Sequence, residues 1–233
     1  MKKVILLTLL ISMFSISPLA AIGGFGLQLG QGAFTVASTV DGGVPFNNSM
    51  IVTVTTGEFS NPISFGGFLY LDLFSDFSLE AELQLTASEY EFEFTNALGT
   101  AGPYKGYWGG ASTYFTVRKE IFGLGIPFLG GGNIFAGGGY NMHTFAPLAD
   151  LSLVENLMEG DLSAEPTFSE DDLVDFVKEN KIDKTGFHVQ AGFQFKLLML
   201  DTFVFYRHSF GEFEDIVGEE SFGSLNIRLG LGI

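Results

Sequence analysis

The sequence predicts an all-β fold, namely an eight-stranded antiparallel up-and-down transmembrane β-barrel with a partly helical long outer loop. The first observation is the alternation in residues 225–233, where every odd position is Leu or Ile and every even position is Asn, Arg or Gly. Successive side chains of a strand point to opposite faces, so this segment has one apolar and one polar face. The second observation is that such segments recur about eight times. The third is that short and long connections between them alternate, as in outer-membrane barrels.

The eight predicted strands are long enough to cross a bilayer when tilted. They cover residues 22–36, 62–74, 77–95, 104–118, 126–145, 186–196, 201–211 and 222–233. The short periplasmic turns are predicted at 75–76, 119–125 and 197–200, and the longer outer loops at 37–61, 96–103, 146–184 and 212–221. Residues 50–57 are expected to form a ribbon beyond the membrane. A ten-stranded barrel, with 50–57 as a separate strand and the fifth strand split, is the alternative.

The third strand changes phase halfway. Leucines and an alanine alternate with polar residues over 79–86, and aromatic residues then alternate with glutamates over 89–94. A β-bulge reverses the face on which a residue points. The pattern therefore predicts a bulge at 87–89.

The N-terminal residues predict export. Residues 1–21 combine Lys2 and Lys3 with an apolar stretch and a small-residue end, which is typical of a signal peptide. An uncleaved anchor is the alternative. Residues 22–233 are expected to form the barrel domain. Residues 121–149 lack charged side chains but contain eight glycines and Pro127, which favours strand over a spanning helix.

Bulk composition narrows the function classes. The chain has 27 Asp and Glu against 11 Lys and Arg, a net charge of −16, and no cysteine. Nucleic-acid binding needs a basic surface, so no nucleic-acid partner is expected. Disulfide bonds and a lipidated cysteine are excluded.

At this point the chain resembles the small bacterial outer-membrane β-barrel proteins, the eight-stranded OmpA-like and OmpX-like group. The resemblance is one of pattern and covers the signal, the runs at 126–130 and 186–195, and the strand at the C-terminus. It implies a bacterial outer-membrane location and assembly by the barrel-assembly machinery. Such proteins usually end in an aromatic residue, whereas this chain ends in Ile233, which puts efficient recognition by that machinery in doubt.

The inward faces near the periplasmic end collect charges of both signs. An eight-stranded barrel is just wide enough for side chains to fill it, and buried charges need partners. We therefore expect a lumen ion-pair network that closes the barrel; a proton- or ligand-responsive gate is the alternative. The network residues are Asp72, Glu80, Glu82, Arg118, Lys196 and Arg228.

No catalytic, cofactor or metal site is predicted. His208 and Ser209 are adjacent, so a regular strand sends them to opposite faces, whereas lipid A deacylases separate these residue types by one position. His143 and His188 lie on other strands without metal-ligand spacing. No twelve-residue calcium loop is present, so ion binding would be diffuse.

The loop at 146–184 is acidic, with 11 Asp and Glu against three Lys. Helices are expected at about 147–158 and from Ser169 to about Lys181, as a solvated lid or as a surface for a cationic partner, such as divalent ions that bridge lipopolysaccharide. The expected role is structural or surface interaction in contact with outer-membrane lipid and lipopolysaccharide. The alternatives are a narrow porin or hydrophobic-solute channel, a lipid A-modifying enzyme, and a water-soluble β-domain with an apolar core.

Overall fold

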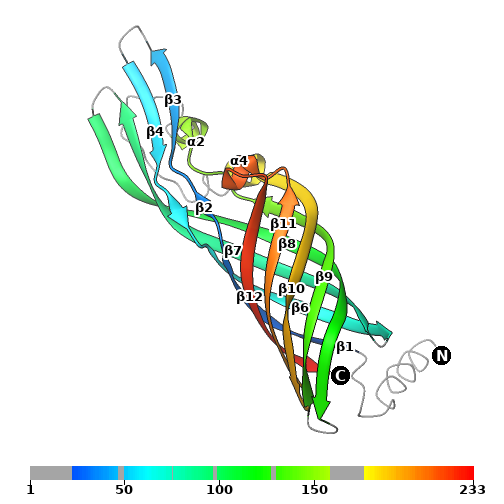
Figure 1. Ribbon diagram of the computed structural model, residues 1–233. Coiled ribbons are helices and arrows are strands. Elements are labelled where there is room, and N and C mark those ends of the chain that lie inside the picture. Colours follow the sequence, from blue (N-terminus) through cyan, green and yellow to red (C-terminus); the bar gives the residue numbers. More distant parts are fainter. Residues whose placement is uncertain (1–22, 47–49, 75, 97–98, 127–129, 158–175) are drawn as a thin grey trace, which may run out of the picture.

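The computed structural model describes residues 23–46, 50–74, 76–96, 99–126, 130–157 and 176–233. Eight antiparallel strands close into a ring, in the order β7, β6, β1, β12, β11, β10, β9 and β8, with β8 hydrogen-bonded back to β7 (Figure 1). The strands are β1 (Gly23–Gly32), β6 (Ile63–Phe74), β7 (Phe77–Asn96), β8 (Gly99–Ile126), β9 (Gly130–Phe145), β10 (Ile182–Leu197), β11 (Leu200–Gly211) and β12 (Ser221–Gly232). The predicted eight-stranded barrel is confirmed, and the ten-stranded alternative is wrong.

The stagger of the ring follows from the pairing register. Leu200 pairs with Leu231, and the paired positions lead through Phe25, Leu69, Ala81, Phe115, Tyr140 and Phe187 back to Phe210 on the starting strand. One circuit therefore shifts the register by ten residues, from 200 to 210. With eight strands at the usual spacing, this shear corresponds to a strand tilt of about 40°. The lumen is correspondingly narrow.

The boundaries of β8 differ most from the prediction. The hairpin of β8 and β9 is longer than expected, because the strand ladder runs from Gly110 paired with Phe145 down to Ile126 paired with Gly130. Residues 119–125, predicted as a turn, therefore lie in β8. The Gly-rich residues 123–126 pair with the Gly-rich residues 130–133 of β9 and do not form a loop. Residues 96–103 are also mostly strand, since β7 ends at Asn96 and β8 begins at Gly99.

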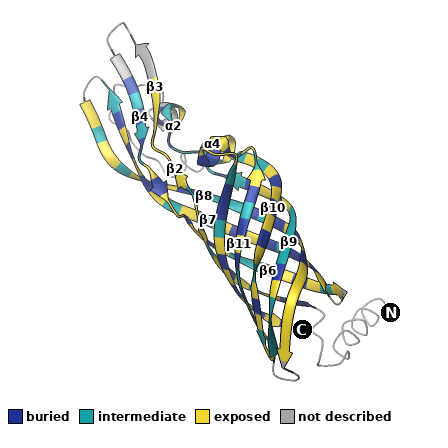
Figure 2. Cartoon of the chain, in the orientation of Figure 1, coloured by how far each residue is buried: buried dark blue, intermediate teal, exposed yellow. Residues whose placement is uncertain are grey.

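Buried and exposed residues alternate along the strands of the barrel (Figure 2), and the exposed face is mainly apolar whereas the buried face carries most of the polar side chains. On β12, Ile227 and Leu229 are about half exposed, whereas Asn226 and Arg228 are fully buried. The same inversion recurs on β1, where Leu27 and Leu29 face outward and Gln28 is buried. A water-soluble domain would place its leucines inside, so the alternative of a soluble β-domain does not describe this fold.

The predicted bulge at 87–89 is wrong. β7 keeps one register against β8 through Leu85–Ala111, Ala87–Gly109 and Glu89–Tyr107, and even-numbered residues face inward along the whole strand. What changes is the chemistry of each face. Glu80 and Glu82 are buried below this point, and Tyr90, Phe92 and Phe94 are buried above it, where glutamates point outward.

The inversion of polarity marks a change of solvent. Below Ala87 the outward side chains are apolar from Phe77 to Leu85, which spans about 20 Å along the barrel axis at the tilt given above. Above Ala87 the strand has the pattern of a protein in water, with charges outside and aromatics inside. The irregularity in the pairing of β7 with β8 lies higher, between Phe92 and Phe94.

A sheet extension rises above the ring on one side (Figure 1). The hairpin of β3 (Thr39–Phe46) and β4 (Met50–Thr56) pairs through β4 with the upper part of β7. The short strands β2 (Thr35–Val36) and β5 (Phe59–Ser60) join this hairpin to the barrel. Residues 50–57 thus form the predicted ribbon, paired with β3 and β7.

Helix α2 (Leu151–Leu157) packs its buried Leu153 and Val154 into a hydrophobic cluster with Val52, Val54 and Phe92 of the extension. The hydroxyl of Tyr90 accepts a hydrogen bond of 2.9 Å from the Ala149 N–H. Burial raises the pKa of Tyr90. A helix is thus present within the predicted range 147–158, and residues 176–180 are helical within the second range.

Part of the sequence-based prediction falls on residues that the structure does not describe. These are the signal peptide at 1–21 and residues 158–175 of the acidic loop. Among the described helices, none is long and apolar enough to span a membrane.

Candidate functional site

The centre of the lumen is a layer of buried ion pairs. Glu80 contacts Arg118 at 2.6 Å and Arg228 at 3.0 Å. Glu82 accepts two hydrogen bonds from Arg207, of 2.5 and 2.9 Å, and is also paired with Arg228. All five side chains are at most 4% exposed. In a low-dielectric interior each charge therefore has an opposite charge beside it, as burial requires.

Amide side chains fill the remaining positions of this layer. Gln28 donates to Glu82 at 2.6 Å and accepts from Arg228 at 2.5 Å, while Gln190 donates to Glu80 at 3.1 Å and accepts from Arg207 at 2.9 Å. Arginine faces also stack on aromatic rings, with the Arg207 guanidinium carbon 3.8 Å from the Tyr114 ring centre. Carboxylates, guanidinium groups and amides thus lock strands from both sides of the ring to each other.

The predicted site residues separate into two groups. Glu80, Glu82, Arg118 and Arg228 meet in the central layer. The other two lie nearer the end of the barrel that carries the termini: Asp72 is 4.0 Å from Arg118, and Lys196 is 3.9 Å from Asp201.

Arg207, which completes the layer, and Asp201, which lies below it beside Lys196, are both fully buried and were missed from the sequence. Asp201 accepts hydrogen bonds from Tyr70 and Gln194. Arg207 and Asp201 are both odd-numbered and face inward with Phe203 and Phe205, so strand parity identifies them once the inward face of β11 is known.

The lumen glycines do not open a channel. A Cβ on Gly24 would lie 2.6 Å from the Tyr70 ring, and one on Gly30 would lie 2.5 Å from both Asn226 and Ser64. These glycines therefore make room for neighbouring side chains. The glycines of β1 therefore give no support to the alternative of a narrow porin or hydrophobic-solute channel.

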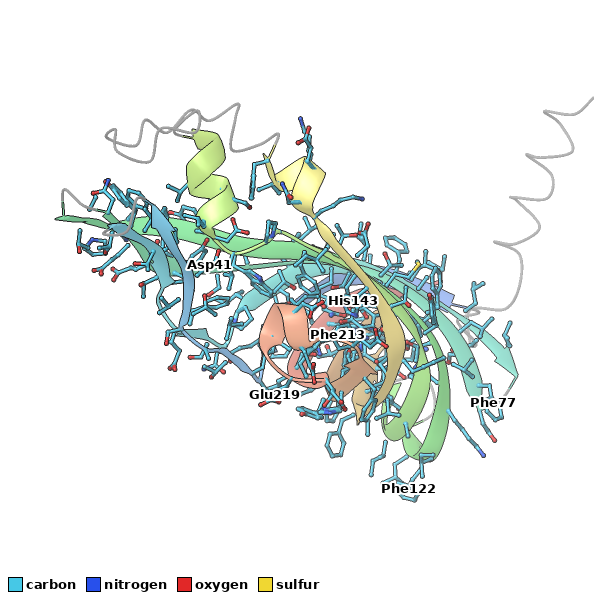
Figure 3. The ribbon with its side chains drawn as sticks, turned by 90° about the horizontal axis from the view of Figure 1, so that it is seen from above. Asp41, Phe77, Phe122, His143, Phe213 and Glu219 are labelled. Atoms are coloured by element: carbon cyan, nitrogen blue, oxygen red, sulfur yellow. The ribbon has the colours of Figure 1, made fainter. Side chains whose placement is uncertain are left out.

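A second layer closes the opposite end, which we call the loop end. Helix α4 (Glu214–Val217) lies between β11 and β12, and the residue before it, Phe213, is fully buried. Seen from above, Phe213 and His143 lie over the centre of the barrel mouth (Figure 3). The Phe213 ring makes edge contacts with His143 and Phe222, at 5.1 and 5.0 Å between centroids, and Lys184 holds α4 through Asp215 at 2.6 Å. The sequence predicted an outer loop at 212–221 but not that Phe213 closes the barrel mouth.

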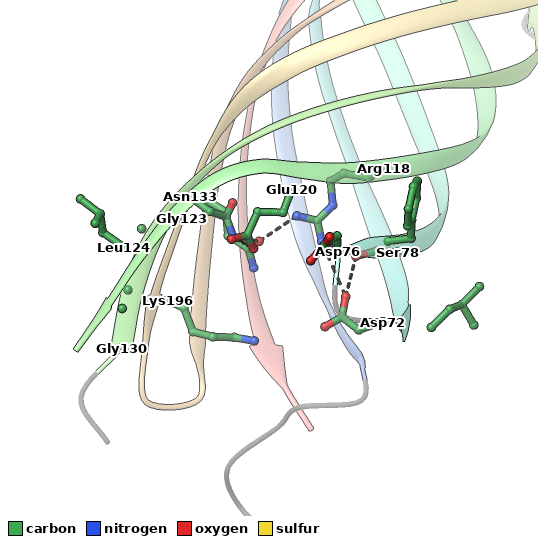
Figure 4. Close-up of a pocket in the computed structure, with 16 residues that line it drawn as sticks. Asp72, Asp76, Ser78, Arg118, Glu120, Gly123, Leu124, Gly130, Asn133 and Lys196 are labelled. Atoms are coloured by element: carbon green, nitrogen blue, oxygen red, sulfur yellow. Dashed lines mark hydrogen bonds and ion pairs between the residues drawn. The ribbon is translucent and has the colours of Figure 1, made fainter. Parts of the chain in front are cut away.

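The end with the termini is open. A cavity of about 650 Å³ reaches up to the ion-pair layer (Figure 4). It is lined by Asp72, Asp76, Glu120 and Lys196, by Arg118 at its inner end, and by glycines of the β8–β9 hairpin. The barrel is thus a cup that opens at one end, with two layers of packed side chains between that cavity and the loop end.

The three histidines each contact a hydroxyl group. His143 and His188 are buried in the upper lumen and contact Ser112 and Thr116, both at 2.8 Å. His208 instead points outward, and Ser209 inward, as the strand parity predicts. Its Nε2 lies 3.1 Å from the Ser221 hydroxyl on β12. Among the described residues, no group of three or more His, Cys, Asp or Glu is placed to hold a metal ion.

Charge is concentrated at the loop end. Of the residues that the structure describes, those within 33–62, 87–110, 145–157, 176–184 and 211–221 lie on that side and include 14 of the 20 acidic residues but only four of the nine basic ones. On the extension, Glu89, Glu91 and Glu93 form an outward row on β7, with Lys105 paired to Glu89 at 2.7 Å. The electrostatic field of the protein therefore favours cations at this end.

No family model and no curated protein matches the sequence. The chain is similar in structure to Ail, the attachment invasion locus protein of Yersinia pestis, with a TM-score of 0.40 and 11% identity over 91% of this chain and 97% of that chain. The structure of the same protein with the heparin analogue sucrose octasulfate gives a TM-score of 0.39 and 13% identity, over 90% and 95% of the two chains. At such low identity the site has to be understood from this chain's own residues.

Proposed function

We propose that the chain is an integral β-barrel protein of a bacterial outer membrane, with a structural or surface-interaction role and no catalysis. The supporting observation is the polarity of the wall, with leucines outside and paired charges inside, up to a boundary near Ala87. Outer-membrane barrels have this arrangement, with an apolar band about 25 Å tall. In this orientation the termini are periplasmic and the loop end faces the medium.

The two packed layers favour a closed barrel over a porin. A conducting pore needs a continuous aqueous path, whereas Arg207, Arg228 and Phe213 are fully buried across the lumen. Opening that path would separate charges that are paired in a low-dielectric interior, which is costly. The barrel therefore serves as a rigid pedestal for what lies above the membrane.

The loop end is the surface that such a pedestal presents. Its acidic residues favour a cationic partner, including the divalent ions that bridge lipopolysaccharide phosphates. The expected contacts are diffuse, because the charge is spread over several segments.

Location and architecture are tested together by membrane fractionation and electrophoresis with and without boiling. A band that shifts on heating, found in the outer-membrane fraction, is expected. Recovery from the soluble periplasm would overturn the proposal. Planar-bilayer recording is expected to show no steady pore, and a stable conductance on the order of a nanosiemens would refute the closed lumen.

The surface role needs a variant that keeps the fold. Deleting residues 148–182 would remove Leu153 and Phe176 from the hydrophobic cluster, so charge is the better variable. Replacing the seven Asp and Glu between 158 and 175 by their amides leaves both in place. Weaker binding of calcium and loss of envelope integrity in EDTA are expected. Unchanged calcium binding and unchanged envelope integrity would contradict a binding role for the acidic loop and would leave it only the role of a solvated cover.

A further inference from the structure

A chain of hydrogen bonds runs across the outer wall of the barrel at β11 and β12. The Tyr206 hydroxyl lies 3.4 Å from His208 Nδ1, and His208 Nε2 lies 3.1 Å from the Ser221 hydroxyl. All three side chains point outward, because Tyr206 pairs with Leu225, His208 with Gly223, and Phe210 with Ser221 in the antiparallel register. We name Tyr206, His208 and Ser221 the wall relay.

The relay begins within the apolar belt and ends at its upper margin. Below it, the outward residues of β12 are Leu225, Ile227, Leu229 and Leu231, all about half exposed. Ser221 is the first residue of β12. A Cβ on Gly223 would overlap the Tyr206 hydroxyl, so the glycine makes room for the relay. Phe210 holds the His208 ring with an edge contact of 4.6 Å between centroids.

The protons of the relay have a preferred direction. A neutral imidazole has one N–H and one acceptor nitrogen. If Tyr206 accepted from His208, its own O–H would be left without an acceptor in the acyl region, which is costly. Tyr206 therefore donates to Nδ1, and Nε2–H donates to Ser221. The Ser221 hydroxyl is then left to donate its proton outward.

We propose that Ser221, oriented by His208 and Tyr206, binds the ester carbonyl oxygen of an outer-leaflet lipid. This rests on the proposed membrane location. Ester groups lie where acyl chains meet headgroups, which is the depth at which the outer face of the barrel turns polar. A neutral hydroxyl donor suits a neutral carbonyl, and the relay contributes no Arg or Lys of the kind that makes the strong charge-assisted bonds to phosphate. The same direction of protons argues against nucleophilic catalysis, in which His208 would have to accept the Ser221 proton.

The test compares lipid retention from two kinds of vesicle. The purified protein is reconstituted in diacyl phosphatidylcholine or in the dialkyl ether analogue, which has the same phosphate but no ester carbonyl. Lipids that remain bound are counted by native mass spectrometry. The wild type is expected to retain the diacyl lipid about two- to tenfold better than the ether lipid, as one hydrogen bond allows. Equal retention of both lipids would overturn the proposal.

Three substitutions separate the relay from a structural role. Ser221→Ala is expected to abolish the preference for the diacyl lipid. Tyr206→Phe is also expected to abolish the preference, although Ser221 is intact. Without the Tyr206 hydroxyl, His208 can carry its proton on Nδ1, so that Nε2 accepts the Ser221 hydroxyl proton and Ser221 no longer donates to the lipid. Thr202→Val, also outward on β11, is the matched control and should retain the preference.

Each sample is also checked for the heat-shifted band, so a protein that fails to enter membranes refutes the proposed function and not the relay alone. An embedded, heat-shifted Ser221→Ala protein with unchanged preference would refute the relay. Release of free fatty acid by the wild type but not by Ser221→Ala would also refute the proposal. It would show that His208 accepts the Ser221 proton, with Ser221 as a nucleophile and His208 as its base.

Discussion

Replacing Glu82 by Gln is the most direct test of the ion-pair layer. The Glu82 carboxylate accepts from Arg207, Arg228 and Gln28, and its side chain is 1% exposed. Gln keeps the volume of the side chain but not its charge. Arg207 would lose its carboxylate partner, and Glu80 would be the one carboxylate left in the layer, shared by Arg118 and Arg228. Removing one partner of a buried ion pair costs about 3–5 kcal/mol. We expect a loss of that size in the free energy of unfolding.

The measurement is urea unfolding of the protein inserted in phosphatidylcholine vesicles, followed by the ratio of folded to unfolded bands without boiling. Glu89→Gln is the matched control, because Glu89 lies on the same strand but pairs with Lys105 in solvent, where side chains are 45% and 66% exposed. Its expected cost is below about 1 kcal/mol. The double variant Glu82→Gln with Arg228→Gln restores the charge balance and should recover much of the loss. A Glu82→Gln cost no larger than that of the control would refute the reasoning.

Three further predictions test the other layers and the boundary. Phe213→Ala removes the buried ring of the lid and should cost about 3–5 kcal/mol in the same unfolding assay without creating a pore, since the ion-pair layer remains; a steady conductance would contradict this. Spin labels on cysteines introduced at Leu83 and Glu91 should differ in accessibility. Oxygen should enhance the relaxation of the label at Leu83 more strongly, and an aqueous nickel complex that of the label at Glu91; the reverse result would contradict a membrane boundary near Ala87. Asn141→Leu should raise the unfolding free energy by about 1 kcal/mol or more, because both polar atoms of this fully buried amide have no hydrogen-bond partner among the described residues; a decrease would show that the amide is satisfied.

Period-two alternation was enough to predict the ring, and it worked best where the two faces differ most. Residues 225–233 alternate strictly, and Glu80 and Glu82 alternate with Leu79 and Leu83, so strand parity alone identifies these inward charges. β11 hid its charges because both of its faces are aromatic. Phe203 and Phe205 point inward and Tyr206 points outward, so Arg207 does not stand out by pattern.

The wrong prediction of a bulge in β7 has a physical cause. A reversal of the apolar face in β7 has two explanations, a bulge in the backbone or a change in the surrounding solvent. The sequence contains the same letters in either case. Only the unbroken register from Leu85 to Glu89 distinguishes them. The lid was missed for a related reason: Phe213 is a single aromatic residue among acidic neighbours, and its burial depends on contacts with β9 and β12 that are distant in sequence.

The unbroken passage of β7 and β8 through the membrane boundary has a mechanical consequence. Their shared ladder continues from Phe77–Lys119 upward past Glu89–Tyr107, so the extension has no hinge at the point where it leaves the lipid. A pull along the strands would load many backbone hydrogen bonds in parallel instead of one after another. A partner bound to the extension would thereby be held at a fixed height and orientation relative to the membrane, and a force on that partner would be transmitted directly to the strands of the barrel.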